Sequence, residues 1–129
     1  MKVPFERETV FSPDWRGNMT LPEEERIRVT ISWPTVLESS KLPDLKFETE
    51  PDPTDEDPKR TVTRATSESL SRFADAVLRQ RVPKIENLEG ITSGAELADA
   101  PEDIFAGLIW DIVVKYRAGQ GALIEKKKD

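Results

Sequence analysis

The fold is decided by an apolar stretch near the end of the chain, PEDIFAGLIWDIVVKYRA at residues 101–118. Pro101 suits the first position of a helix, where its missing N–H is not needed. At about 100° per residue, Gly107, Asp111 and Lys115 form one narrow polar stripe, and apolar side chains occupy most of the remaining circumference. A helix with so much apolar surface has to be buried on more than one side. In a chain of 129 residues, one covering surface is expected to be another protein chain.

Two interpretations of this helix are open. The first makes it the central helix of one domain, packed between a second helix and a sheet. The second leaves surplus apolar surface for a partner protein, a second copy or an apolar segment, so that the chain is a possible homo-oligomer. Trp110 and Val114 are the best candidates for an exposed contact, whereas the face with Phe105, Leu108 and Ile112 is expected to be core. The full set of predicted protein-binding residues is Phe105, Ile109, Trp110, Val113 and Val114.

A second helix is predicted from about residue 66 to Arg81, because capping residues precede an apolar repeat with helical spacing. Its apolar stripe comprises Leu70, Phe73, Ala74, Val77 and Leu78, and its exposed face is expected to carry Ser71, Arg72, Asp75, Arg79 and Arg81. Pro83 ends it. An extended or turn segment at Val82–Leu88 and a short helical turn at Ala95–Ala98 are predicted to follow.

Strands are predicted in the N-terminal half. Residues 26–33 alternate apolar and polar side chains, which indicates a half-buried strand ended by Pro34. A shorter alternation at residues 45–50 is expected to pair with it in an antiparallel arrangement, and residues 2–11 could add an edge strand. The fold class is therefore α+β, with a small antiparallel sheet from the N-terminal half packed with two main helices from the C-terminal half.

The chain is expected to form a single domain over residues 1–129. Residues 1–50 are the strand-rich part, 61–118 the helical part and 119–129 a flexible tail. Residues 51–60 are an acidic, proline-rich loop that offers little to bury. Because this loop lacks the ligand spacing of a calcium-binding loop, it is interpreted as a solvated segment with no metal.

Composition excludes several kinds of function. The chain carries 19 basic and 25 acidic residues, and a net charge of −6 disfavours a nucleic acid or an anionic membrane as partner. It contains no cysteine and no histidine, which removes disulfides, thiolate metal sites and the usual general base near neutral pH. The longest apolar stretch, residues 104–114, is shorter than the roughly 20 residues needed to cross a bilayer. We therefore expect a cytoplasmic, non-enzymatic protein with no cofactor.

The order of elements in the C-terminal half is a further feature of the sequence. A helix is followed by VPKIENLEGITSGAEL at residues 82–97, then by Ala100-Pro101 opening the apolar helix, and finally by a lysine-rich end. In this order, residues 61–128 resemble tail assembly chaperones of long-tailed bacteriophages. The resemblance implies a protein that binds an apolar, helical tape-measure chain and catalyses no reaction. The chain departs from the family where Tyr116–Gly121 stands in place of a serine-leucine stretch, and the N-terminal half lies outside the resemblance.

Two alternative functions fit the same residues. The chain could be a permanent virion subunit of a tail or connector, in which the apolar surface makes a lasting contact. It could also be a small acidic inhibitor protein that mimics nucleic acid.

Overall fold

The computed structural model describes residues 6–51 and 61–126, with side chains described as far as Gly119. Two short 3-10 turns, η1 and η2, lie between the first two strands. The elements, in chain order, are β1 (Glu8–Phe11), η1 (Asn18–Thr20), η2 (Glu23–Glu25), β2 (Arg28–Ser32), α1 (Val36–Ser39), β3 (Phe47–Pro51), β4 (Thr61–Ala65), α2 (Ser67–Arg81), β5 (Lys84–Glu86), α3 (Gly94–Ala98) and α4 (Glu102–Lys126). This mixture of antiparallel sheets and helices confirms the α+β class.

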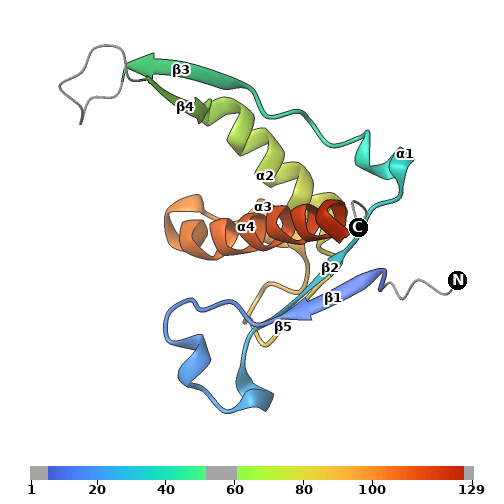
Figure 1. Cartoon of the computed structure of the whole chain (residues 1–129). Helices are drawn as coiled ribbons and strands as arrows, with labels where there is room; N and C mark the ends of the chain where they lie inside the picture. The colour runs from blue at the N-terminus through green and yellow to red at the C-terminus, as the bar shows by residue number, and fades with distance from the viewer. Residues whose placement is uncertain (1–5, 52–60, 127–129) are drawn as a thin grey trace, which may run out of the picture.

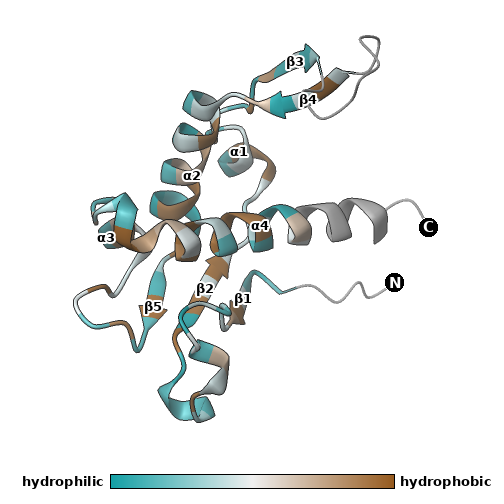
Figure 2. Cartoon of the chain, turned by 90° about the vertical axis from the view of Figure 1, so that its left-hand side faces the viewer, coloured by the Kyte–Doolittle hydropathy of each residue, from teal (hydrophilic) through white to brown (hydrophobic). Residues whose placement is uncertain are grey.

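A three-stranded antiparallel sheet in the order β1-β2-β5 supports the helices. The predicted strand at residues 26–33 is its central strand, and the weak edge strand predicted at residues 2–11 is β1. Val29 and Ile31 are fully buried on the sheet face that meets α2 and α4. Figure 1 shows α4 lying between α2 and this sheet, and Figure 2 shows hydrophobic residues where the three meet. The core is therefore a small sheet covered on one face by two helices.

The predicted pairing of residues 45–50 with residues 26–33 is wrong. β3 pairs with β4 in a separate antiparallel hairpin, with Phe47 opposite Ala65 and Thr49 opposite Thr63. The physical reason is that β1 and β5 occupy both edges of β2, so no edge of β2 is left for β3. Residues 61–65 also form a strand where the helical part was expected to begin, because Thr61, Val62 and Thr63 are β-branched residues that favour strands.

The predicted helix before Pro83 is α2, and its start and the burial of Phe73, Ala74, Val77 and Leu78 are confirmed, whereas Leu70 is only half-buried. Thr66 caps it, since its Oγ1 accepts a hydrogen bond from the Ser69 N–H at 3.2 Å. Arg81, which we expected on the exposed face, is 7 % exposed and faces α1. It follows Val77 by four residues and Leu78 by three, which places it on the same side of the helix as those buried residues.

The helix that begins after Pro101 continues to Lys126, beyond its predicted end at about residue 118, and the flexibility of residues 119–129 stays a prediction. Trp33 packs against this part of the helix. Its ring stacks on Tyr116 with centroids 5.6 Å apart and lies directly against Gly119, where a Cβ would overlap the ring. Because Gly119 has no side chain, the helix can pass Trp33 and continue. No helix within the described residues is long and apolar enough to cross a membrane. The acidic loop predicted at residues 51–60 lies, from residue 52 onward, outside the described residues.

Candidate functional site

A groove of about 150 Å³ lies between α2 and the first half of α4, next to the end of α3. Ala74 and Leu78 line it from α2, and Ala106, Ile109 and Trp110 line it from α4. The amphipathic pattern of each helix explains this placement, because Leu78 and Ile109 sit at the edges of stripes that are otherwise buried in the core. The groove floor is therefore a continuation of the hydrophobic core that reaches the surface.

Small side chains create the hollow. Ala98, Ala100 and Ala106 stand where α3, the following turn and α4 approach α2. A methyl group at each of these positions leaves space that a larger side chain would fill. The groove thus exists because small side chains do not fill the space at the helix junction. Its walls are apolar on three sides.

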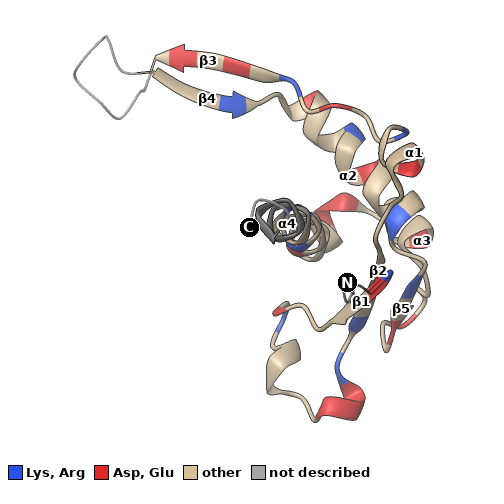
Figure 3. Cartoon of the chain, turned by 45° about the vertical axis from the view of Figure 1, so that its right-hand side comes forward, with Lys and Arg blue, Asp and Glu red and all other residues tan. Residues whose placement is uncertain are grey.

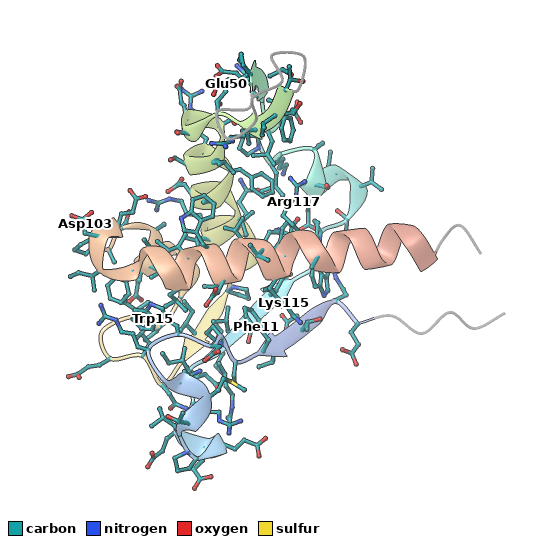
Figure 4. All side chains as sticks on the ribbon, turned by 60° about the vertical axis from the view of Figure 1, so that its left-hand side comes forward. Phe11, Trp15, Glu50, Asp103, Lys115 and Arg117 are labelled. Carbon is teal, nitrogen blue, oxygen red and sulfur yellow. The ribbon has the colours of Figure 1, made fainter. Side chains whose placement is uncertain are left out.

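The rim of the groove is acidic. Asp75 on α2 and Glu102 at the start of α4 both border it, and Asp103 follows in the first turn of α4 (Figure 4). Asp99 ends α3 close by. Arg79 is a basic residue in this region, and it forms ion pairs with Asp75 and Asp99. The rim therefore carries a net negative charge.

Arg79 also ties the walls of the groove together. Its Nε donates to Asp75 Oδ1 at 3.0 Å and its Nη2 donates to Asp99 Oδ1 at 2.5 Å, which links α2 to the end of α3. The hydrogen bond from Arg79 lowers the pKa of Asp99, and the bonds to Asp99 and Asp75 raise the pKa of Arg79. Asp99 and Arg79 therefore stay charged at neutral pH, and the groove has an ionic link at its rim.

The five residues predicted to bind protein are divided between surface and core. Ile109 and Trp110 line the groove, and Val114, one turn beyond Trp110, is 63 % exposed. Val113, also predicted to bind protein, is 5 % exposed and packs in the core. Phe105 is half-buried against Trp15, with ring centroids 5.8 Å apart. Only part of the predicted set therefore borders one surface.

The opposite flank of α4 is partly covered by the chain itself. Lys115, expected in the polar stripe, lies with its Nζ 5.7 Å from the centre of the Phe11 ring (Figure 4). Trp15 packs over Gly107, leaving little space at that position for a side chain. Apolar surface of α4 therefore remains open beside the groove, at Val114, and also at Ile104, which is 47 % exposed.

The walls that α2 and α3 contribute to the groove were not predicted from the sequence. Ala74 was predicted only as part of the buried stripe of the second helix, and Ala106 was not singled out. The signal that could have indicated a groove was the recurrence of alanine at residues 95, 98, 100 and 106 around the helix junction. Nothing local in the sequence shows that these alanines face α2.

No cluster of three or more acidic side chains with the spacing of a metal site occurs among the described residues. A comparison of the chain with protein-family models, with curated proteins and with solved structures finds no match. The groove and its charge are therefore the basis for a functional proposal.

Proposed function

We propose that this chain is a non-enzymatic protein-binding module, whose groove between α2 and α4 receives an apolar side chain from a basic helical segment of a partner protein. The observation that carries the proposal is the combination of an apolar floor with an acidic rim on a rigid helix junction. The floor would provide affinity and the rim would select the charge of the partner.

The size of the groove favours a side chain over a small-molecule ligand. Pockets for such ligands usually enclose about 300–1,000 Å³. The groove here measures about 150 Å³, and an apolar cavity of about that volume in another protein holds a molecule the size of benzene. One leucine, phenylalanine or similar side chain is thus the expected occupant.

The surface beside the groove favours a helical partner. Val114 follows Trp110 by four residues and lies on the same side of α4. A partner helix laid along this line could place one apolar residue in the groove and another against Val114. Its lysine or arginine side chains would then reach Asp75 and Glu102.

The resemblance of residues 61–128 to tail assembly chaperones narrows this proposal to one kind of partner. The partner would be the tape-measure chain of a long-tailed bacteriophage, a long helical protein that needs a soluble companion before assembly. A net charge of −6 on the companion would limit association between complexes while the apolar groove holds the client.

A designed peptide tests the general proposal. The probe is a synthetic amphipathic helix with leucines on one face and lysines on both flanks, titrated into the full chain by calorimetry. Binding is expected, with an affinity that falls as salt increases. A peptide with glutamates in place of the lysines should not bind. Equal binding of both peptides, or of neither, would contradict the proposal.

A pair of variants locates the binding surface. Ala106→Leu fills the groove and should weaken peptide binding by about tenfold or more, equivalent to roughly 1.4 kcal/mol. Ala76→Leu is the matched control, because Ala76 is half-buried on α2 outside the groove. It should leave the affinity unchanged. If both variants bind as the wild type does, the peptide occupies another surface.

Co-expression tests the narrower proposal. The tape-measure protein of the same phage should remain soluble with the wild-type chain and become insoluble with Ala106→Leu. Finding this chain in stoichiometric amounts in finished particles would instead identify a permanent subunit.

A further inference from the structure

The β3–β4 hairpin is separate from the groove and forms a two-stranded sheet apart from the three-stranded one. Figure 1 shows it projecting from the start of α2, away from α4 and the three-stranded sheet. Phe47, at the base of the hairpin, is 58 % exposed. Isolated two-stranded hairpins are marginally stable in water, and a third strand or more is usually required. Pairing with another strand would therefore stabilise the hairpin.

The direction of its backbone groups can be assigned from one hydrogen bond. The Thr66 N–H donates to the Lys46 carbonyl at 2.8 Å, so residue 66 points its amide toward β3. In an antiparallel ladder the direction alternates from one residue to the next. Accordingly, the N–H and C=O groups of Ala65, Thr63 and Thr61 point away from β3, to the outer edge of β4. The same alternation directs those of Phe47, Thr49 and Pro51 to the outer edge of β3.

The two edges differ in their donors. Each of the three outward residues of β4, Thr61, Thr63 and Ala65, carries an N–H. On β3, Pro51 has no N–H, so one of the three outward positions cannot donate. Within the described part of the chain, neither edge is paired with a further strand. The outer edge of β4 is therefore the better template for an added strand.

The charges show which edge can pair with a second copy of itself. Figure 3 shows acidic residues on β3 and a basic residue on β4. If two β3 strands paired about Thr49, Glu48 would lie opposite Glu50 of the second copy, and like charges placed opposite one another destabilise a sheet. If two β4 strands paired about Thr63, Val62 would lie opposite Arg64 of the second copy, with no like charges facing each other.

We propose that β4 pairs antiparallel with β4 of a second copy about a two-fold axis at Thr63, which joins the two hairpins into one four-stranded sheet. Thr61 of each copy would then exchange hydrogen bonds with Ala65 of the other. The contact is isologous and closes as a dimer. Because α2 follows Ala65 directly, the antiparallel pairing directs the two α2 helices to opposite ends of the sheet and keeps the two cores apart.

Two proline variants test the pairing edge. Thr63→Pro removes an outward N–H of β4, whereas Thr49→Pro removes an outward N–H of β3, and neither removes a backbone hydrogen bond between the two strands. Both variants lose the same side-chain hydrogen bond between Thr49 Oγ1 and Thr63 Oγ1, so the pair stays matched. By sedimentation equilibrium, the wild type and Thr49→Pro should be dimers, and Thr63→Pro should be a monomer. A monomeric wild type would overturn the proposal. Loss of association in both variants would also overturn it, because it would mean that β4 pairs with β3 of the next copy in an open chain.

Charged substitutions at Thr63, on the proposed two-fold axis, test the pairing without introducing a proline. Thr63→Lys and Thr63→Glu should each weaken the dimer by roughly five- to tenfold, because two like charges would face each other across the axis. Mixing the two variants should restore a heterodimer. Failure of the mixture to associate better than either variant alone would count against an axis at Thr63. Peptide binding in the groove should be the same in all these variants, so the outcome is separate from that of the proposed function.

Discussion

Arg81, near the end of α2, donates a hydrogen bond from Nη2 to Glu38 Oε2 at 2.9 Å, although the arginine side chain is 7 % exposed. Its Nε and Nη1 are buried with no hydrogen-bond partner in the structure. Glu38 belongs to α1, a single helical turn fixed by a capping box with Thr35. The pair therefore joins α1 to α2 and holds Val36 and Leu37, which are 92 % and 70 % exposed, at the surface.

This ion pair predicts a pH-dependent stability. The hydrogen bond from Arg81 is the largest cause that lowers the pKa of Glu38 from 4.5 to about 2. Because the folded-state pKa is the lower one, the ionised carboxylate stabilises the fold above pH 4.5, and this contribution is lost as the pH falls from 4.5 to about 2. Glu38→Gln should therefore lower the urea midpoint at neutral pH, with the difference from the wild type disappearing toward pH 2.

Glu68→Gln is the matched control for that measurement. Glu68 forms an exposed ion pair with Arg72 at 2.6 Å on the same helix as Arg81. Exposed pairs of this spacing contribute only about 0.3–0.5 kcal/mol. A difference between Glu38→Gln and the wild type that persists unchanged in acid would show that the charge of Glu38 is not its cause.

The contact between Trp33 and Gly119 predicts that the substitution Gly119→Ala destabilises the folded state. Gly119→Ala would place a Cβ inside the space of the indole ring, and overpacking of this kind costs about 1–3 kcal/mol. The higher helix propensity of alanine offsets at most about 1 kcal/mol of this loss of stability. Chemical denaturation should show a net loss of stability in the wild-type background. In a Trp33→Leu background the same change should be neutral or stabilising, and equal losses in both backgrounds would exclude the ring as the cause.

Neighbouring valines on α4 should respond in opposite ways. Val113 is buried beside Phe73 and Tyr116, and Val113→Asp would leave an unpaired charge in the core, so we expect the folded state to be lost. Val114→Asp should change stability by no more than about 0.5 kcal/mol, because that side chain is exposed. Thermal unfolding followed by circular dichroism distinguishes the two. Unfolding of Val114→Asp would mean that this flank is part of the core.

Replacing Asn18, which lies in the 3-10 turn η1, should lower the stability of the fold substantially. Its Oδ1 accepts a hydrogen bond from the Ile27 N–H at 2.8 Å, and its Nδ2 donates to the Pro13 carbonyl at 2.8 Å and to the Ile27 carbonyl at 3.3 Å. Asn18→Ala leaves these buried groups unpaired and should cost at least about 1–3 kcal/mol. Asn18→Asp keeps the acceptor and removes both donors, so it should also destabilise. A neutral Asn18→Ala in denaturant titrations would contradict this role.

Local patterns in the sequence were sufficient for several elements. The helical repeat before Pro83 and the alternation around Val29 each indicate which side of an element is buried, because side-chain direction follows from the backbone period. The same reasoning placed Leu108 and Ile112 in the core, where both are fully buried. In the candidate site it identified Ile109 and Trp110, but only from the α4 side.

Other features depend on residues far apart in the chain. The separation of β3 from the main sheet follows from competition for the edges of β2, in which β5, more than fifty residues away, takes the place expected for β3. The burial of Arg81 depends on Glu38, 43 residues earlier. The absence of room for a side chain at Gly119 depends on the approach of Trp33, far earlier in the chain.

The sequence by itself determined that this chain is an acidic α+β protein with an unusually apolar last helix, because composition and periodicity are local properties. Only the tertiary structure decided that the open apolar surface is a groove walled by alanines, with an acidic rim held by Arg79. The physical reason is that a period shows which face of a helix is buried and cannot show what covers it. That is determined by which other elements pack against the face and by how much of it their side chains leave uncovered.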